Sequence, residues 1–428
     1  MSDQETAQLT AADKQFLWHP FMDMPEWRAP ENEPVVILEG RGAILRDSRG
    51  REYLDGNSSI WTNVHGHNHP RINDAIREQL ERIAHCSFLG ATHPSAIELA
   101  REIVALFPPQ TLTRVFYSDD GSTAMEVALR VASQFFRMRG ETERNTFIYF
   151  RHAYHGDTAG AAALGAATMF GGNGEQWRFP VQMVCSVEEL LQLSPTHRDK
   201  TAAVVIEPLI QGAAGMRVWP RGTCATVREW CDRNGALLIA DEVMTGFGRT
   251  GKMFAIEHEQ VVPDIIALGK GLSGGYLPLA MTLTTEELFE EFNGSVSSGR
   301  ALAYGHSYTA NPLGCAAARA SLGVFREEKV LEHLQPKISA LTRLLRGVRD
   351  LPGVEDVRQC GFVAGIEVTD EATARQVCRC ARGYGLLTRN VREVVVLMLP
   401  LCTTLQQLER AVAALCNAIA ADRNPVPA

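Results

Sequence analysis

The sequence lacks any run of about eighteen apolar residues that is free of charges and glycines, so we expect no membrane span. It also lacks a C-x-x-C pair, although it has ten cysteines, and we expect all of them, Cys86 included, to be reduced and packed. The first residues, MSDQETAQLTAADKQ, have no apolar signal core. A cytoplasmic location is therefore expected.

Basic residues are not in excess either. The formal net charge is -8 and the pI is about 5.9, which gives no reason to expect nucleic acid or an anionic membrane as a partner. The 428 residues are 45% hydrophobic and 21% charged, an ordinary globular composition with enough length for a large core.

What the sequence does contain is a set of short apolar runs that end in charged residues. AVVIEP ends at Glu207, LLIADE ends at Asp241 and Glu242, and DIIALGKG contains Lys270. Such runs, bounded by Gly and Pro, are typical of buried parallel strands, whose carboxyl ends carry ligand sites in open α/β sheets. A charged residue there costs free energy unless it is paired or used. The pattern therefore favours a lysine and an aspartate that converge on a cofactor.

Pyridoxal phosphate is the cofactor whose chemistry needs this pair. A lysine forms a Schiff base with the cofactor aldehyde, and a carboxylate keeps the ring nitrogen protonated, so that the ring withdraws electrons. Asp241 and Lys270 are the candidates. The alternative interpretation of the same two residues is a helix-capping aspartate and a surface lysine.

The stretch IADEVMTGFGRTGKMFAIEHEQVVPDIIALGKGLSGGYLPLA resembles the signature of the class III (ω-) aminotransferases, a fold-type I pyridoxal phosphate family. The resemblance implies that Lys270 is the Schiff-base lysine and Asp241 the partner of the pyridinium nitrogen. It also implies that Val243 packs on one face of the ring, and that Glu207 and Gln211 lie near the 3-hydroxyl.

Two segments are candidates for the cofactor phosphate. FYSDDGSTAMEVAL reads as a strand and then a helix whose first residues, Gly121 and Ser122, offer free N–H groups, although Ser and Asp also cap helices routinely. In the family this is the phosphate cup. ALAYGHSYTANP resembles the segment that reaches across a homodimer, with Ser307 on the partner's phosphate and Gly305 near the substrate. Tyr304 stands where the family usually has His, and the alternative is a simple turn before a helix.

Candidate substrate residues near the amino terminus follow from a resemblance to the 7,8-diaminononanoate synthases, the biotin-pathway branch of class III. WHPF places Phe21 in the substrate pocket, unless it only anchors the tail. NSSIWTNVHGHNHP places Ile60 and Trp61 near the substrate. The histidines at 65, 67 and 69 have no further ligands at zinc spacing, so no metal site is expected.

Further substrate candidates lie later in the chain. In FIYFRHAYHGDTAGA, Tyr154 resembles the aromatic residue that stacks on the cofactor ring, and Asp157 resembles an acid near the substrate amine, its alternative being a helix cap. Arg389 stands where the branch binds a substrate carboxylate, a role that suits a planar guanidinium; the alternative is a solvated edge arginine. Asn390 and Leu399 replace prolines that are usual in the branch. The segment 165–193 is shorter than the usual one.

The fold class expected from the resemblance is α/β, with a large domain built on a mainly parallel seven-stranded sheet and a small α+β domain made from both chain ends. We assign residues 1–70 to the amino-terminal part of the small domain, residues 71–315 to the large domain and residues 316–428 to the carboxy-terminal part of the small domain. The active unit is expected to be a homodimer, because Ser307 would act in the partner's site.

The function expected is a pyridoxal phosphate-dependent aminotransferase that acts on a small-molecule amino donor and a keto acceptor. The first hypothesis is conversion of 8-amino-7-oxononanoate to 7,8-diaminononanoate, with S-adenosylmethionine as the usual donor. Phe21 and Ile60-Trp61 look more like the lysine-using enzymes. A broad ω-amine:pyruvate or 4-aminobutyrate-type aminotransferase is the alternative, favoured by the short segment and by Asn390. A non-catalytic cofactor-binding protein and an aminomutase are the remaining ones.

Overall fold

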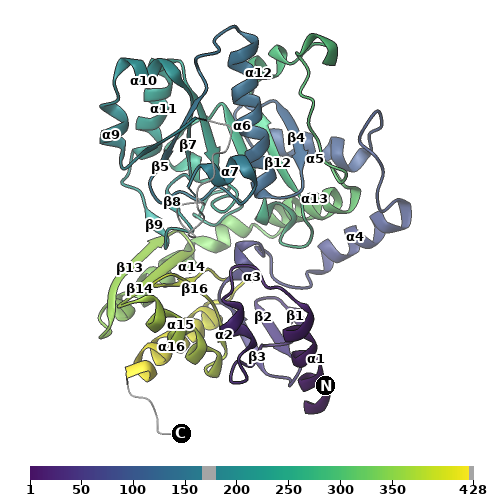
Figure 1. Ribbon diagram of the computed structural model, residues 1–428. Helices are drawn as coiled ribbons and strands as arrows, with labels where there is room; N and C mark the ends of the chain where they lie inside the picture. Colours follow the sequence, from purple (N-terminus) through teal and green to yellow (C-terminus); the bar gives the residue numbers. More distant parts are fainter. Residues whose placement is uncertain (166–179, 424–428) are drawn as a thin grey trace.

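A seven-stranded sheet forms the centre of the computed structural model, which describes residues 1–165 and 180–423 (Figure 1). The strand order is β4, β12, β11, β10, β7, β5, β6, and of the described strands in this sheet only β12 is antiparallel to its neighbours. The predicted mainly parallel sheet is confirmed. Its strands are β4 (Arg114–Ser118), β5 (Thr146–Phe150), β6 (Val181–Val184), β7 (Thr201–Ile206), β10 (Leu237–Asp241), β11 (Ile265–Leu268) and β12 (Ala280–Thr284).

The three apolar runs form the middle of this sheet as β7, β10 and β11. Every residue of these strands is buried. β10 pairs in parallel with both neighbours, with Ile239 opposite Ile265 and Ala240 opposite Ile206. Because the three strands run in the same direction in matched register, the residues that follow them emerge at one edge of the sheet.

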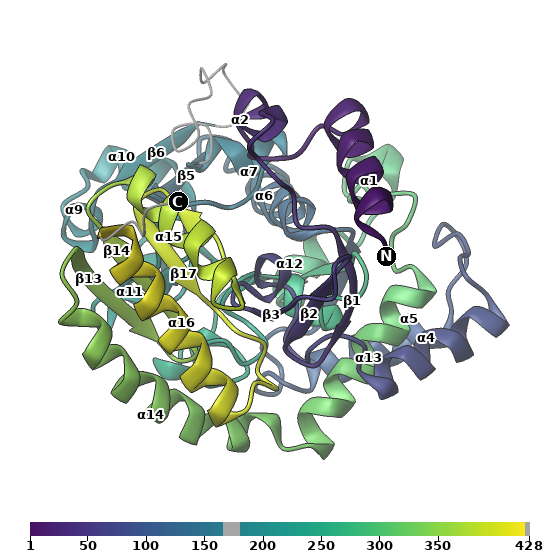
Figure 2. The ribbon, with the colours of Figure 1, turned by 90° about the horizontal axis from the view of Figure 1, so that it is seen from below.

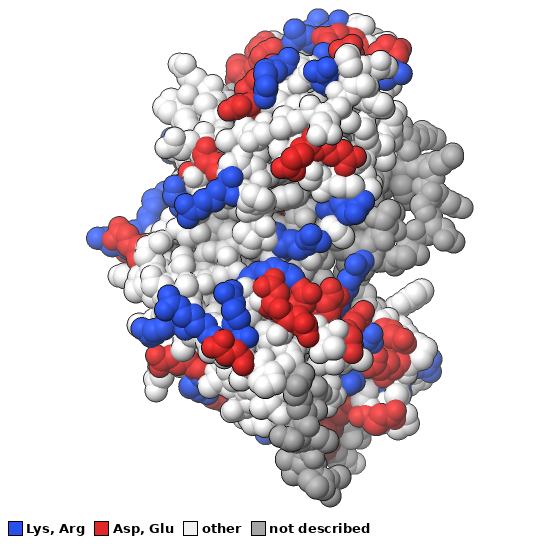
Figure 3. All heavy atoms as spheres, turned by 90° about the vertical axis from the view of Figure 1, so that its left-hand side faces the viewer, with Lys and Arg blue, Asp and Glu red and all other residues white. Residues whose placement is uncertain are grey.

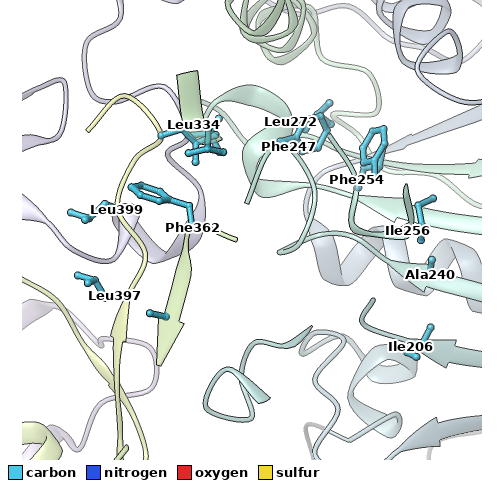
Figure 4. Packing of buried hydrophobic residues seen from close by; sticks show 14 of the residues in the cluster. Ile206, Ala240, Phe247, Phe254, Ile256, Leu272, Leu334, Phe362, Leu397 and Leu399 are labelled. Carbon is cyan, nitrogen blue, oxygen red and sulfur yellow. The ribbon is translucent and has the colours of Figure 1, made fainter. Parts of the chain in front are cut away.

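Helices cover both faces of the sheet, and alternate strand residues face them. Val205 and Ile239 belong to the core cluster that includes α6, whereas Val204 and Leu238 belong to the cluster that includes α11. Figure 4 shows how the second cluster continues from the strands toward the carboxy-terminal part of the chain. The helices of this half are α4 (Pro70–Arg82), α5 (Pro94–Val104), α6 (Gly121–Met138), α7 (Ala159–Ala163), α9 (Val187–Leu191), α10 (Pro195–Lys200), α11 (Thr223–Asn234), η1 (Ala255–His258), η2 (Lys270–Ser273), α12 (Glu286–Glu291), η3 (Val296–Ser298) and α13 (Pro312–Glu327).

Two four-stranded sheets lie below the large sheet in Figure 1, and both ends of the chain contribute to this layer. The predicted meander at residues 35–56 forms β1 to β3, and β15 adds to it in parallel, with Leu386 opposite Leu54. The second sheet has the order β13, β14, β17, β16. The strands are β1 (Ile37–Arg41), β2 (Ile44–Asp47), β3 (Glu52–Asp55), β13 (Val354–Cys360), β14 (Val363–Val368), β15 (Leu386–Leu387), β16 (Asn390–Val391) and β17 (Val394–Leu397).

The amino-terminal and carboxy-terminal segments lie side by side in both views (Figures 1 and 2). Glu26 of α2 joins them, because it pairs with Arg375 and Arg379 of α15. The helices of this layer are α1 (Asp3–Phe16), α2 (Met24–Arg28), α3 (Ser58–Trp61), α14 (Val330–Arg349), α15 (Glu371–Gly383) and α16 (Leu405–Arg423). A small hairpin, β8 (Ile210–Gln211) with β9 (Arg217–Val218), lies beyond β7.

The predicted domain limits at 70/71 and 315/316 stay a prediction. The first falls at the start of α4, and the second falls inside α13, which packs against α4 and α5. Residues 166–179 of the shortened segment 165–193 lie outside the described residues. Among the described residues, no helix has the length and apolar character that crossing a membrane requires.

Candidate active site

Charged side chains lie mainly on the surface, with both signs interspersed on the face shown in Figure 3, so the buried ones are informative. Asp241, the last residue of β10, is one of them. Its Oδ2 accepts a hydrogen bond from Nδ1 of His155 at 2.7 Å, and its Oδ1 accepts one from the Val243 N–H at 3.0 Å. Two donors from different segments therefore fix the orientation of this carboxylate.

Glu207 follows β7 on the neighbouring strand and is also buried. Its two oxygens accept hydrogen bonds from the N–H groups of Tyr154, at 3.2 Å, and Gly212, at 2.9 Å. Burial, assisted by the nearby Asp241 and opposed by His155, raises the pKa of Glu207 to about 7. The carboxyl group thus ties the loop after β5 to the turn before β9.

Lys270 begins η2 directly after β11, with a left-handed φ of 43°. Its Nζ lies 4.8 Å from the ring centroid of Trp61. Burial lowers the pKa of Lys270 to about 8, although Asp241 and Glu207 act in the opposite direction. An amine with this pKa is substantially neutral at slightly alkaline pH, which is the state that a nucleophile requires.

Trp61 reaches Lys270 from the amino-terminal layer. It is 7% exposed, and its Nε1 donates to Oδ1 of Asn57 at 2.8 Å. The buried guanidinium of Arg249 donates to the carbonyls of Trp61, at 3.2 Å, and Asn63, at 3.0 Å. Ile60, beside Trp61, is 45% exposed. The aromatic wall over the lysine is therefore held from two sides.

The amino terminus of α6 approaches the same strand edge. Asp120 caps the helix by accepting from the Thr123 N–H at 2.8 Å. A Cβ on Gly121 would lie 2.4 Å from Cγ1 of Val243, so only glycine fits there. Ser122 accepts through Oγ from the Asp157 N–H at 3.2 Å. The first N–H groups of a helix have no acceptor within the helix, so Gly121 and Ser122 present donors at this edge.

Tyr154 and Arg389 lie at the outer side of the site. The hydroxyl of Tyr154 donates to Oδ2 of Asp157 at 2.7 Å, and burial, followed by Asp157, raises the pKa of Tyr154. Burial lowers the pKa of Arg389, while Cys378 and Tyr154 oppose that shift. Nε of Arg389 donates weakly to the carbonyl of Asn390, at 3.4 Å. Gln211 donates from Nε2 to the carbonyl of Arg151 at 3.0 Å.

Three of the predicted residues lie outside this buried cluster. Phe21 is 53% exposed, and Gly305 and Ser307 are exposed on the loop before α13. On that loop Tyr304, which replaces the family's usual His, contacts Nε2 of His306 through its hydroxyl at 2.9 Å. The structure thus brings most predicted residues together, while Phe21, Gly305 and Ser307, like Ile60 and Asp157, are exposed in the single chain.

Each of the three alternating histidines forms a hydrogen bond with a different side chain. Nε2 of His65 lies 3.0 Å from Oγ of Ser321, and Nε2 of His69 lies 3.1 Å from Oε1 of Glu328. His67 contacts Asp55 at 2.9 Å through Nε2. Each ring therefore points to a different partner.

Sequence reasoning gave no role to two residues that hold the site together. His155 lies between Tyr154 and Gly156 in the motif that was recognised, yet nothing local indicates that its ring turns to Asp241. Arg249 lies in the GFGRTG turn, and its carbonyl acceptors at Trp61, Asn63 and Leu399 are far away in sequence. The signal in the sequence that could have identified His155 and Arg249 is their position within long segments that resemble the family.

The comparisons with known proteins agree with this geometry. The family model of the class-III aminotransferases matches residues 27–419. A relative in Geobacter sulfurreducens, adenosylmethionine-8-amino-7-oxononanoate aminotransferase, is 43% identical over 440 residues and covers 96% of each chain. The chain therefore belongs to the class-III aminotransferases, and it is an enzyme of that class.

Two solved structures extend this result. The adenosylmethionine-8-amino-7-oxononanoate aminotransferase of Methanocaldococcus jannaschii has a TM-score of 0.93 and 38% identity, covering 97% of this chain and 99% of that one. An amine transaminase from an uncultivated Pseudomonas species, in its PLP-bound form, has a TM-score of 0.89 and 30% identity, covering 95% and 98%. The expected fold-type I architecture is confirmed.

Proposed function

We propose that this protein transfers an amino group from S-adenosylmethionine to 8-amino-7-oxononanoate, with pyridoxal phosphate as its cofactor. The amino-bearing carbon of the donor becomes a keto carbon, and the keto carbon of the acceptor receives the amino group to give 7,8-diaminononanoate. The observation that carries the proposal is the Lys270 amine, with its lowered pKa, at the strand edge that also holds Asp241. Relatives named adenosylmethionine-8-amino-7-oxononanoate aminotransferase align with 96% and 97% of this chain.

Three features of the site fit pyridoxal phosphate. The glycine at 121 lets a helix amino terminus, where backbone N–H groups attract a phosphate, lie directly against Val243. Asp241 offers an oriented carboxylate for the ring nitrogen. The buried Nε2 of His155 has no hydrogen-bond partner among the described residues, so the polar cluster is incomplete in the protein alone.

Pyridoxal phosphate, when bound, supplies an aldehyde carbon that joins the amine and a ring that withdraws electrons from it. Lys270 would hold the cofactor and would then, as a free amine, carry a proton on Nζ away from the donor carbon and back. Asp241 would keep the ring nitrogen protonated, with His155 fixing its orientation. Gly121 and Ser122 would hold the phosphate, with Val243, Glu207 and Gln211 around the ring.

Arg389 would bind the carboxylate of the acceptor. Burial removes water from the Arg389 guanidinium and so lowers its pKa, and a bound carboxylate would stabilise the charged form by pairing with it. Tyr154 would stack on the cofactor and Asp157 would orient the substrate amine, with their mutual hydrogen bond setting the geometry. Trp61, Ile60 and Phe21 would form the apolar wall for the carbon chain.

A homodimer is part of the same proposal. Gly305 and Ser307 are exposed in the single chain, and their predicted roles are in the site of a second copy. Tyr308, the next residue along the chain and 61% exposed, leaves apolar surface for such a partner. A cytoplasmic location completes the proposal.

The test is a set of half-reactions with the purified, pyridoxal phosphate-loaded protein. S-adenosylmethionine, lysine, 7,8-diaminononanoate and a simple ω-amine are added separately, and the visible absorbance of the cofactor is followed. Conversion by 7,8-diaminononanoate and by S-adenosylmethionine supports the proposal. Conversion by lysine in place of S-adenosylmethionine changes the donor, as Phe21 and Ile60 suggested from the sequence.

A broad ω-aminotransferase is the second candidate, and the Arg389-Asn390 pair favours it, because the usual proline is missing. Asn390 donates from its side chain to the carbonyl of Arg392 at 2.7 Å, which shapes this hairpin differently from a proline. Rapid conversion by the simple ω-amine, with none by 7,8-diaminononanoate, would replace the first proposal by this one.

A further inference from the structure

The four-residue element α3 (Ser58–Trp61), which carries Trp61, has a left-handed backbone and is not an ordinary right-handed helix. Ser58, Ser59, Ile60 and Trp61 all have positive φ, at 44°, 48°, 66° and 69°. None of them is glycine, and a side chain disfavours this left-handed region relative to the right-handed one. Consecutive residues of this kind persist only where the surroundings impose them. This left-handed turn therefore needs an anchor.

The side chain of Asp55 accepts hydrogen bonds from the turn and from the residue that precedes it. It is the last residue of β3 and is 2% exposed. Its Oδ1 accepts from the Ser59 N–H at 3.0 Å, and its Oδ2 accepts from the Ser59 hydroxyl at 2.9 Å. The Asn57 N–H also donates to Oδ1, at 3.3 Å. One carboxylate thus accepts from both hydrogen-bond donors of Ser59, in the middle of the turn.

The far side of this carboxylate is fixed as well. Oδ2 of Asp55 lies 2.9 Å from Nε2 of His67, and Nδ1 of the same ring lies 3.0 Å from Nδ2 of Asn63. The backbone of His67 bridges to Gly42 in the amino-terminal sheet. Asp55 therefore sits between a rigid strand, an immobilised imidazole and the strained turn.

The turn determines where two walls of the site lie. It places the Trp61 ring 4.8 Å from Nζ of Lys270 and leaves Ile60 45% exposed beside it. Relaxation of Ser59 toward the right-handed region would rotate the following residues away, because successive φ and ψ angles set the direction of the chain.

We propose that Asp55 is a positioning residue for this enzyme: its carboxylate holds the left-handed turn Ser58–Trp61 and so places Trp61 and Ile60 against Lys270 and the substrate. The inference rests on the proposed function, because it concerns the wall of the same site. Asp55 acts through Ser59 and touches neither cofactor nor substrate.

The chain offers a matched control in Asp47. This aspartate is also 2% exposed, also ends a strand of the amino-terminal sheet, and accepts from the N–H groups of Arg49 and Arg51 and from the Tyr53 hydroxyl. Its contacts lie within its own hairpin. Asp47→Ala therefore removes a comparable buried carboxylate without touching the turn at 58–61.

The experiment compares Asp55→Ala with Asp47→Ala as loaded enzymes. For Asp55→Ala we expect KM for 8-amino-7-oxononanoate to rise at least tenfold, with a smaller change in kcat, and for Asp47→Ala we expect both constants to stay within about twofold of the wild type. Asp55→Asn keeps one oxygen for the Ser59 N–H but replaces the other oxygen with an amide NH2, so it should reverse only part of the rise in KM. Equal effects of Asp55→Ala and Asp47→Ala would overturn the inference.

Acrylamide quenching of Trp61 gives a readout that does not depend on activity. The sequence has six tryptophans, so the signal of Trp61 is the difference between each protein and the same protein with Trp61→Phe. We expect the quenching constant of Trp61 to rise at least twofold in Asp55→Ala and to stay unchanged in Asp47→Ala. An unchanged constant in Asp55→Ala would sink the inference. The quenching remains informative even if 8-amino-7-oxononanoate is not a substrate.

A rescue variant covers the case in which Asp55→Ala folds poorly. Glycine occupies the left-handed region without a steric cost, so Ser59→Gly should relieve the strain that Asp55 opposes. Added to Asp55→Asn, it should bring KM closer to the wild-type value by about threefold or more. No change, or a further rise of KM, would mean that Asp55 does not act through this turn.

Discussion

His155 donates from Nδ1 to Oδ2 of Asp241 across 2.7 Å, and both side chains are buried. This contact joins the loop after β5 to the end of β10, two strands away in the sheet. Because Asp241 also accepts from the Val243 N–H, the protein fixes the orientation of this carboxylate before any cofactor binds. The carboxylate is therefore preorganised for its proposed role at the ring nitrogen.

Asp241→Asn should lower kcat for transamination by about 100-fold or more, because a neutral amide does not stabilise the protonated ring nitrogen. The matched control is Glu242→Gln, since Glu242 is the next residue, is fully buried and accepts from the Ile256 N–H at 2.8 Å, away from Asp241. We expect that control to keep kcat within about threefold. Steady-state kinetics of both variants would check this, and equal losses would contradict the role of Asp241.

The reaction of the cofactor-free protein with pyridoxal phosphate should follow the protonation of Lys270. Only the neutral amine attacks an aldehyde, and burial lowers the pKa of Lys270 to about 8. The rate should therefore rise about tenfold per pH unit below pH 8 and level off above it. Stopped-flow absorbance measures this rate, with a blocked free lysine as the control. A rate that keeps rising to the ordinary lysine pKa, as the control does, would refute the expectation.

Gly121→Ala should weaken cofactor binding and destabilise the protein, because the added Cβ would lie 2.4 Å from Cγ1 of Val243. We expect an increase of at least tenfold in the dissociation constant of pyridoxal phosphate and a loss of about 1–3 kcal/mol in unfolding free energy. Gly347→Ala, in α14, is the control, because its Cβ would meet nothing within 4 Å. Fluorescence titration and denaturant unfolding distinguish the two, and a harmless Gly121→Ala would show that this contact yields.

Arg389→Gln should raise KM for the carboxylate-bearing acceptor by about 10- to 100-fold with a smaller effect on kcat, because a charged hydrogen bond to the substrate is lost in ground and transition states alike. Arg382→Gln serves as the control: burial also lowers the pKa of Arg382, but its electrostatic neighbours are Cys378, Tyr53 and Arg379. Kinetics with acceptors that lack the carboxylate should be insensitive to Arg389→Gln. Equal sensitivity of both acceptors would remove Arg389 from the carboxylate site.

The central sheet was predictable from local patterns. AVVIEP, LLIADE and DIIALGKG are short apolar runs bounded by Gly and Pro, which is typical of strands buried on both faces, and they form β7, β10 and β11. The convergence of Asp241 and Lys270 followed from the rule that parallel strands share a carboxyl edge. The antiparallel direction of β12 did not follow, since its sequence, AMTLT, carries no signal for direction.

The contacts that hold the site were not predictable in the same way. His155 and Asp241 are distant in sequence. Arg249 donates to the carbonyls of Asn63 and Leu399, which lie toward opposite ends of the chain. The left-handed turn at Ser58–Trp61 was invisible as well, because none of its residues is glycine and the carboxylate that imposes it belongs to the preceding strand. Propensity describes each residue alone, whereas these features depend on tertiary partners.

The parallel pairing of β15 with β3 affects how the chain folds during its synthesis. Leu54 finds its partner Leu386 only after about 330 further residues have been made, a separation with a high entropic cost of closure. Until then β3 is an open strand edge on the emerging chain, which makes it a site for mispairing between nascent chains. Translation of the final segment is therefore the step at which the amino-terminal sheet, and the wall of the site that it carries, becomes complete.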